Sequence, residues 1–109
     1  MSSISTHVID VVLGKPAAGI AVHLQRREQD EWVAVSVSST DQDGRCRDLA
    51  SDGSDGTYRL MFLTSDYFGR QGRTSLYREI TITFFCDGEA HYHLPVLLSD
   101  NSYTTYRGS

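Results

Sequence analysis

Two histidines separated by one residue, His91 and His93, lie in a stretch of alternating apolar residues near the end of the chain. Residues two apart in a β-strand point to the same face, so both imidazoles share one side of such a strand. His7, in another apolar and β-branched stretch, could add a third nitrogen ligand, which is a donor set known from catalytic zinc sites. No Asp, Glu or Cys accompanies the pair at a diagnostic spacing, so the sequence favours a site without metal.

The terminal segment 102–109 is rich in aromatic and β-branched residues and alternates like a final strand. Chain ends are usually small, polar and unpacked, so an ordered terminal strand is unusual. The segment also carries a phenol, a guanidinium, a hydroxyl and a terminal carboxylate close together, on Tyr106, Arg107 and Ser109. We therefore expect it to contribute to a functional site.

Strand periodicity predicts which way the histidines face. In segment 90–98, one face is apolar and should pack in the core, which places His91 and His93 on the opposite, outer face. In segment 4–13, His7 projects from the outer face if Val8 faces the core. That outer face also carries four apolar residues: Ile9, Val11, Pro95 and Leu97. Such a face is either an interface between copies of the chain or a ligand groove, and periodicity alone leaves both open.

These residues must be positioned by an almost entirely β structure. We expect one domain over residues 1–109, an all-β antiparallel β-sandwich of seven to eight strands with one short helix. The helix is expected at 65–71, with Thr64 or Ser65 as its N-cap. Two Asp-Gly pairs, at 43–44 and 87–88, predict hairpin turns. Residues 45–50 are expected to be irregular and 51–56 to form a surface loop, with strands at 4–13, 20–25, 32–37, 57–63, 79–86, 90–98 and from 102.

The composition excludes several partners. The net charge of −4 argues against a nucleic acid, which needs a basic stripe. No apolar run approaches the ~20 residues of a membrane span, and the N-terminus has no basic and apolar leader, so we expect a cytoplasmic protein with no membrane partner. The two cysteines, Cys46 and Cys86, lack metal-type spacing and are expected to be free thiols.

Two further candidates have ordinary interpretations when taken alone. His23 shares its strand face with Ala21 and Gln25 and is expected to be a surface or rim residue. Arg45 directly follows the predicted turn at Asp43-Gly44 and would usually be a solvated loop arginine.

Taken together, the motifs resemble the transthyretin-related proteins. The N-terminal signature is matched by 5–10 and 14–19, and the C-terminal signature by 91–95, 97–99 and 106–109. The ending Tyr106-Arg107-Gly108-Ser109 is similar to that of the enzyme branch, the 5-hydroxyisourate hydrolases, and separates it from the transthyretin carriers. The chain departs from the pattern at Asp100, where a stiffening proline is usual, and in the 51–56 loop.

The resemblance implies a homotetramer of β-sandwiches with a central channel, and no cofactor or metal. The implied reaction is hydrolysis of 5-hydroxyisourate to 2-oxo-4-hydroxy-4-carboxy-5-ureidoimidazoline. His7 and His93 would activate the water, with Ser109 completing the hydrogen-bond chain. Arg45 would hold the substrate carbonyls and the oxyanion, and Tyr106 would position the ring.

Two alternatives to this reaction stay open. The first is a non-catalytic carrier of a small aromatic ligand, and the second is a structural module whose outer face only oligomerises. The resemblance also leaves open which histidine is the general base.

Overall fold

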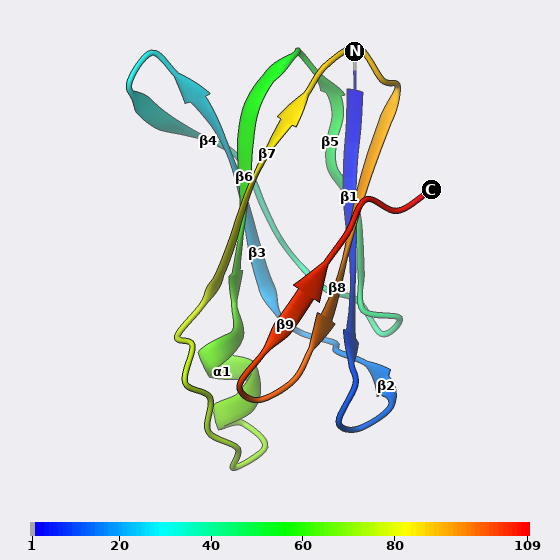
Figure 1. Cartoon of the computed structure of the whole chain (residues 1–109), viewed down its shortest axis with the longest axis vertical. Helices are drawn as coiled ribbons and strands as arrows, with labels where there is room; N and C mark the ends of the chain where they lie inside the picture. The colour runs from blue at the N-terminus through cyan, green and yellow to red at the C-terminus, as the bar shows by residue number, and fades with distance from the viewer. Residues whose placement is uncertain (1) are drawn as a thin grey trace.

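Two β-sheets pack face to face, with a short helix at one end of the sandwich (Figure 1). The computed structural model describes residues 2–109 and, except for Ser2 and Asp52, their side chains. The predicted all-β sandwich is confirmed. Its strands are β1 (Ser2–Asp10), β2 (Lys15–Pro16), β3 (Ala21–Glu28), β4 (Glu31–Ser39), β5 (Arg45–Gly53), β6 (Gly56–Leu63), β7 (Ile80–Cys86), β8 (His91–Leu98) and β9 (Tyr103–Thr105).

The first sheet is built around β1 and β8, which run side by side in the order β2-β1-β8-β9. On its other edge β1 pairs with β5 along its first part and with β2 at its end. The pairing of β1 with β8 is parallel, from Ser3 beside His91 to Asp10 beside Leu98. This is the one departure from the expected antiparallel pairing among the described strands, and it brings the two histidine-bearing segments into contact.

The second sheet has the order β4-β3-β6-β7, with antiparallel pairing throughout. Both sheets turn alternate side chains inward, as their sequences predict. On β8 the predicted core face is buried and the face with His91 and His93 points outward. The buried side chains of β8 on that core face are Tyr92, Leu94, Val96 and Leu98.

Strand β5 corrects the prediction for residues 45–56. The segment was expected to be irregular and then a loop, but Arg45–Gly53 is a strand paired with β1. Its serine, aspartate and glycine content is poor for a strand, and the register shifts twice along the pair. The exposed edge of β1 supplies backbone partners whatever side chains β5 carries, so tertiary pairing overrides the local preference.

The two Asp-Gly turns also differ from their prediction. Neither makes a hairpin, because each carries the chain from the second sheet to the first, from β4 to β5 and from β7 to β8. Gly44 has a φ of 76°, and a Cβ atom there would lie 2.4 Å from the carbonyl oxygen of Val8. The Val8 N–H donates to the Gly44 carbonyl at 2.8 Å. Only glycine permits this approach, which sets the following residue, Arg45, against β1.

Several boundaries shift for local reasons. β1 ends at Asp10 rather than at Leu13, because the Asp10 carboxylate accepts the N–H groups of Val12 and Leu13, both at 3.1 Å, and closes a turn. The helix α1 is Thr64–Gly69 and has no side-chain N-cap. Within residues 2–109, no helix is long and apolar enough to cross a membrane.

A buried ion cluster connects the end of β1 to the loop after α1 and to the turn before β9. Asp10 is fully buried and accepts hydrogen bonds from Arg73 at 2.7 Å and from the Tyr67 hydroxyl at 2.8 Å. Arg73 also bonds Asp100 at 2.5 Å and lies over the Phe68 ring. Asp100, at the position where the resemblance led us to expect a proline, is therefore bonded to Arg73, so the turn before β9 has an anchor of its own.

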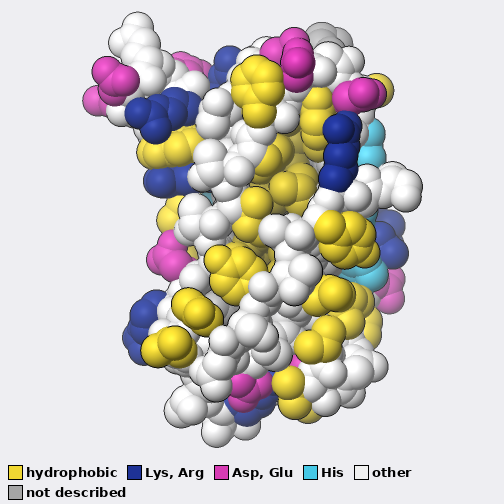
Figure 2. Space-filling model, viewed as in Figure 1, with side chains coloured by type: hydrophobic (Ala, Val, Ile, Leu, Met, Phe, Trp, Pro, Cys, Tyr) yellow, Lys and Arg dark blue, Asp and Glu magenta, His cyan; other side chains and the backbone are white. Residues whose placement is uncertain are grey.

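One long edge of the sandwich lies between β7 and β9. Within the described residues each of these strands has a strand partner on one side only. Figure 2 shows hydrophobic side chains gathered along this edge. Phe85 and Tyr106 are 60% and 54% exposed there. Bare strand edges of this kind readily pair with another chain.

Candidate active site

A polar pocket of about 270 Å³ opens on the outer face of the first sheet. Three of the predicted site residues, Arg45, His93 and Ser109, line it, although they come from three separate segments. The strands β1, β5 and β8 form its floor. The remaining lining residues are Ser5, Thr6, Cys46, Arg47 and His91.

His93 is held from both sides. Its Nδ1 lies 2.8 Å from the hydroxyl oxygen of Ser5, its direct neighbour on β1. On the other side the Gly108 N–H donates to the His93 carbonyl at 2.8 Å. A Cβ atom at Gly108 would lie 2.6 Å from Cδ2 of the ring, so glycine lets the end of the chain pack against the imidazole. Among the described residues, no hydrogen bond involves Nε2 of this ring, and His93 lines the pocket.

His7 and Arg45 are direct partners in the pairing of β1 with β5. Both are half-buried, and His7 lies beside the pocket rather than in its lining. Among the side chains that the structure describes, Arg45 has no ion-pair partner. Arg47, further along β5, instead lies 3.9 Å from Asp41 and 3.7 Å from Asp43. The guanidinium of Arg45 is therefore available to a bound ligand.

The electrostatics of the pocket favour a neutral His93 and a negatively charged or carbonyl-rich ligand. Burial lowers the pKa of His93 below its ordinary value, and the neighbouring basic groups Arg45, His91 and His7 act in the same direction. A neutral imidazole can accept a proton at physiological pH. The fixed charge of Arg45 can hold an oxyanion that develops nearby.

Ser5 and Cys46 are among the pocket residues that the sequence analysis did not assign to the site. Ser5 lies between the imidazoles, 2.8 Å from Nδ1 of His93 and 3.2 Å from Nε2 of His91. The two rings stack with centroids 6.2 Å apart. Strand alternation does put Ser5 on the same face as His7, but the register that sets it opposite His93 cannot be read from alternation. Cys46 also lines the pocket, and burial raises the pKa of its thiol.

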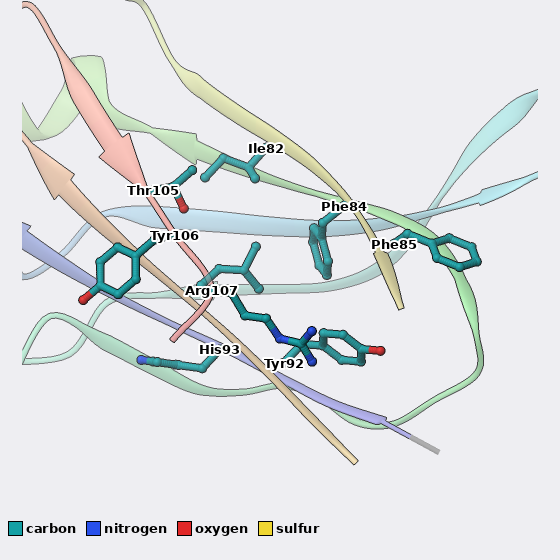
Figure 3. A pocket seen from close by; sticks show the side chains of 9 residues that line it. Ile82, Phe84, Phe85, Tyr92, His93, Thr105, Tyr106 and Arg107 are labelled. Atoms are coloured by element: carbon teal, nitrogen blue, oxygen red, sulfur yellow. The ribbon is translucent and has the colours of Figure 1, made fainter. Parts of the chain in front are cut away.

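Tyr106 lies apart from these groups. It lines a second, mostly apolar pocket of about 220 Å³ between β7 and β8–β9, with its ring turned away from Phe84 (Figure 3). Arg107, which had no predicted role, extends over the Tyr92 ring at 5.0 Å. His93 borders both pockets. Within one chain the structure therefore brings Arg45, His93 and Ser109 together but leaves Tyr106 on the other side of His93.

The histidines do not converge as a metal-binding group. In the part of the chain that the structure describes, no three His, Cys, Asp or Glu side chains are placed to hold a metal ion. His91 and His93 turn ring nitrogens toward serine hydroxyls instead. His23 lies on β3 of the other sheet, half-buried and away from this site. Both cysteines are free, as predicted.

Comparisons with known proteins show which family the chain belongs to. The model of the HIUase/Transthyretin family matches residues 4–108, which is nearly the whole chain. The chain belongs to this family.

The similar proteins within this family include both 5-hydroxyisourate hydrolases and transthyretins. The mouse 5-hydroxyisourate hydrolase is 40% identical over 113 residues, covering 99% of this chain and 96% of the mouse protein. The Klebsiella pneumoniae 5-hydroxyisourate hydrolase has a TM-score of 0.91 at 35% identity, covering 100% of both chains. Sea bream transthyretin, solved with thyroxine, has a TM-score of 0.93 at 30% identity, covering 97% and 94%. The names of the hydrolase relatives indicate that this chain is a hydrolase.

Proposed function

We propose that this protein hydrolyses 5-hydroxyisourate, a product of urate oxidation, to 2-oxo-4-hydroxy-4-carboxy-5-ureidoimidazoline. The observation that carries the proposal is the meeting of Arg45, His93 and Ser109 in one polar pocket, with His7 next to Arg45. The names of the relatives supply the substrate. At about 270 Å³ the pocket lies just below the range of about 300–1,000 Å³ that suits drug-sized ligands, so a small molecule fits it.

The reaction adds one water molecule and breaks one ring bond. A histidine of the pair His7 and His93 takes a proton from water as the oxygen attacks the ring carbonyl. The tetrahedral oxyanion that results is held by the guanidinium of Arg45. When it collapses, the carbonyl C–N bond breaks, the nitrogen takes up a proton, and a carboxylate is formed with net release of one proton.

The remaining site residues bind and orient. Ser109, at the rim of the pocket, is placed to hydrogen-bond the water or the substrate. We keep Tyr106 as a proposed contact to the substrate ring. Its exposed position beside His93 suits a ligand that is enclosed when a second copy of the chain covers this face.

We further propose that four copies assemble with the pockets facing a central channel. The unpaired outer edges of β7 and β9 and the hydrophobic surface between them support this (Figure 2). The turn after β1 adds exposed apolar side chains, at Val11, Val12 and Leu13. Light scattering should give a mass four times 12.2 kDa. A monomer at micromolar concentration would contradict this assembly.

A second candidate is a carrier of a small aromatic ligand. It is favoured by the TM-score of 0.93 with sea bream transthyretin, a protein solved with thyroxine. A carrier needs no group that activates water, whereas this pocket contains a histidine whose pKa is lowered by burial. Beside it lies Arg45, for which the described side chains provide no ion pair. The hydrolase is therefore the better-supported function.

The activity can be tested directly. Urate and urate oxidase generate 5-hydroxyisourate in the cuvette, and its ultraviolet absorbance decays slowly by itself. Adding the protein should accelerate the decay, and Arg45→Ala or His93→Ala should lower kcat/KM by about 100-fold or more. His23→Ala, on the other sheet, is the matched control and should keep full activity. An unchanged decay rate with folded wild-type protein would refute the hydrolase and leave the carrier.

We place this activity in the cytoplasm. Cys46 and Cys86 are buried free thiols, which suits a reducing compartment and supports this location.

A further inference from the structure

Four polar side chains form a continuous row across β1 and β8. Ser3 bonds Nδ1 of His91, Nε2 of His91 lies 3.2 Å from Ser5 Oγ, and Ser5 Oγ lies 2.8 Å from Nδ1 of His93. The parallel register produces this row, because it sets Ser3 beside His91 and Ser5 beside His93. Each serine therefore bridges from one strand to a ring on the next, and the row ends at the pocket.

One assignment of donors satisfies both hydrogen bonds at the outer end of the row. Besides His91, the Ser3 hydroxyl reaches the carbonyl oxygen of Ala90 at 3.4 Å. A carbonyl oxygen can only accept, so both contacts are satisfied when Ser3 donates its single hydroxyl proton to Ala90. Ser3 must then accept from His91, which requires the proton of a neutral His91 to be on Nδ1.

The donor and acceptor of each following hydrogen bond, from His91 to His93, are then determined in turn. A neutral His91 with its proton on Nδ1 has a lone pair on Nε2, so it accepts the hydroxyl proton of Ser5. Ser5 has then used its only donor, and its oxygen accepts from Nδ1–H of His93. His93 consequently carries its proton on Nδ1 and keeps a lone pair on Nε2, a nitrogen that no hydrogen bond among the described residues occupies.

We propose that Ser5 is a positioning residue that holds His93 in its Nδ1–H tautomer, so that Nε2 of His93 is the proton acceptor in the pocket. The kinetic part of this inference rests on the proposed hydrolase function, and the tautomer itself does not. The proposal selects His93, rather than His7, as the general base. It adds no covalent step, because Ser5 acts only on the orientation and the proton position of the ring.

The groups around His93 are compatible with this state. His7 faces it from β1, Arg45 from β5, His91 from β8, and Ser109 from the end of the chain. Burial together with the three basic groups lowers the pKa of His93, which favours the neutral ring. Protonated His91 would donate from both nitrogens and reverse the row, placing the proton of His93 on Nε2. The row therefore couples the base to the protonation of the exposed His91.

Nitrogen-15 NMR of the histidine side chains tests the tautomer without substrate. In wild-type protein at pH 8, His93 should show its proton on Nδ1, with Nε2 unprotonated. In Ser5→Ala the ring should shift toward the Nε2–H tautomer that free imidazoles prefer. A wild-type His93 protonated on Nε2, or one unaffected by Ser5→Ala, would overturn the proposal even if the protein hydrolyses 5-hydroxyisourate.

Kinetics provide the second readout. Ser5→Ala should lower kcat/KM for 5-hydroxyisourate about tenfold, through kcat and with a changed acidic limb of the pH profile. Ser5→Thr keeps the hydroxyl and should recover most of the loss. The matched control is Ser36→Ala, which removes a serine hydroxyl on β4 that donates to the Leu49 carbonyl of β5, outside the lining of the pocket.

The outcomes separate the two proposals. Equal activities and equal pH profiles for Ser5→Ala and Ser36→Ala would overturn the positioning role. If wild-type protein does not hydrolyse 5-hydroxyisourate at all, the proposed function fails, while the NMR result still decides the tautomer.

Discussion

The two polar clusters on β1 differ in how completely their groups are paired. At the end of the strand, Asp10 is fully buried and Arg73 binds two carboxylates, Asp10 at 2.7 Å and Asp100 at 2.5 Å. Near the middle of the strand, Ser5 and His93 lie at an open pocket. Arg45 beside them has no ion pair among the described side chains.

The difference separates stabilising groups from functional ones. Buried polar groups that satisfy one another, as around Asp10, hold the strand, the helix end and the loop before β9 together. Groups left without a protein partner cost some stability but remain available to a ligand. One strand thus carries a closed cluster that anchors the fold and an open cluster suited to chemistry, and only Val8 and Ile9 separate His7 of the open cluster from Asp10 of the closed one.

Removing the arginine of the closed cluster should have the largest effect. Arg73→Met leaves the buried carboxylate of Asp10 without its counter-charge, and the free energy of unfolding should fall by about 3–5 kcal/mol. Urea denaturation measures this loss. Arg47→Met, which breaks exposed pairs with Asp41 and Asp43, should cost less than about 1 kcal/mol. Similar losses in both variants would show that the Asp10 cluster is no more important to stability than a surface pair.

Removing the C-terminal residues from the open cluster should greatly lower activity and change stability only slightly. Deletion of 106–109 takes away Ser109 and the packing of Gly108 on His93, and kcat/KM for 5-hydroxyisourate should fall at least 100-fold. The free energy of unfolding should change by only about 1 kcal/mol, because these residues are mostly exposed. A deletion variant that keeps full activity would remove the end of the chain from the site.

Low pH should gradually remove the contribution of the closed cluster to the free energy of unfolding, with a smaller effect than the changes above. Burial alone would raise the pKa of Asp10, but hydrogen bonds from Arg73, Leu13 and Tyr67 outweigh it and bring the pKa below its ordinary value. The stability gained from this carboxylate is therefore complete above about pH 4 and is lost as the pH falls toward the lowered pKa. The difference in unfolding free energy between wild type and Asp10→Asn should shrink below pH 4, and a difference that is constant or grows would contradict this.

Most of the fold could be predicted because strand alternation is a local signal. The faces of β8 and the outward position of His91 and His93 follow from a period of two. Strand β5 could not be predicted, since its pairing depends on the free edge of β1 rather than on its own residues. The Asp-Gly turns were read as hairpins because their local geometry is the same whether the next strand joins the same sheet or the other one.

The candidate site could be predicted only in part. His93, Arg45 and Ser109 were named from a family resemblance, and the structure brings them together in one pocket. Ser5 was missed because a serine in a strand carries no signal until the register places it opposite His93. Arg73 gave no signal at all, since its partner Asp10 lies 63 positions earlier in the chain.

The parallel pairing of β1 with β8 also sets when the pocket can form. Ser5 and His93 are 88 positions apart, and no shorter connection can bring them together. Contacts of such long range are made late, after the intervening chain has been synthesised and the second sheet can close over the core. A growing chain therefore carries His7 and Arg45 before His93 has been synthesised, and the pocket forms in one of the last events of folding.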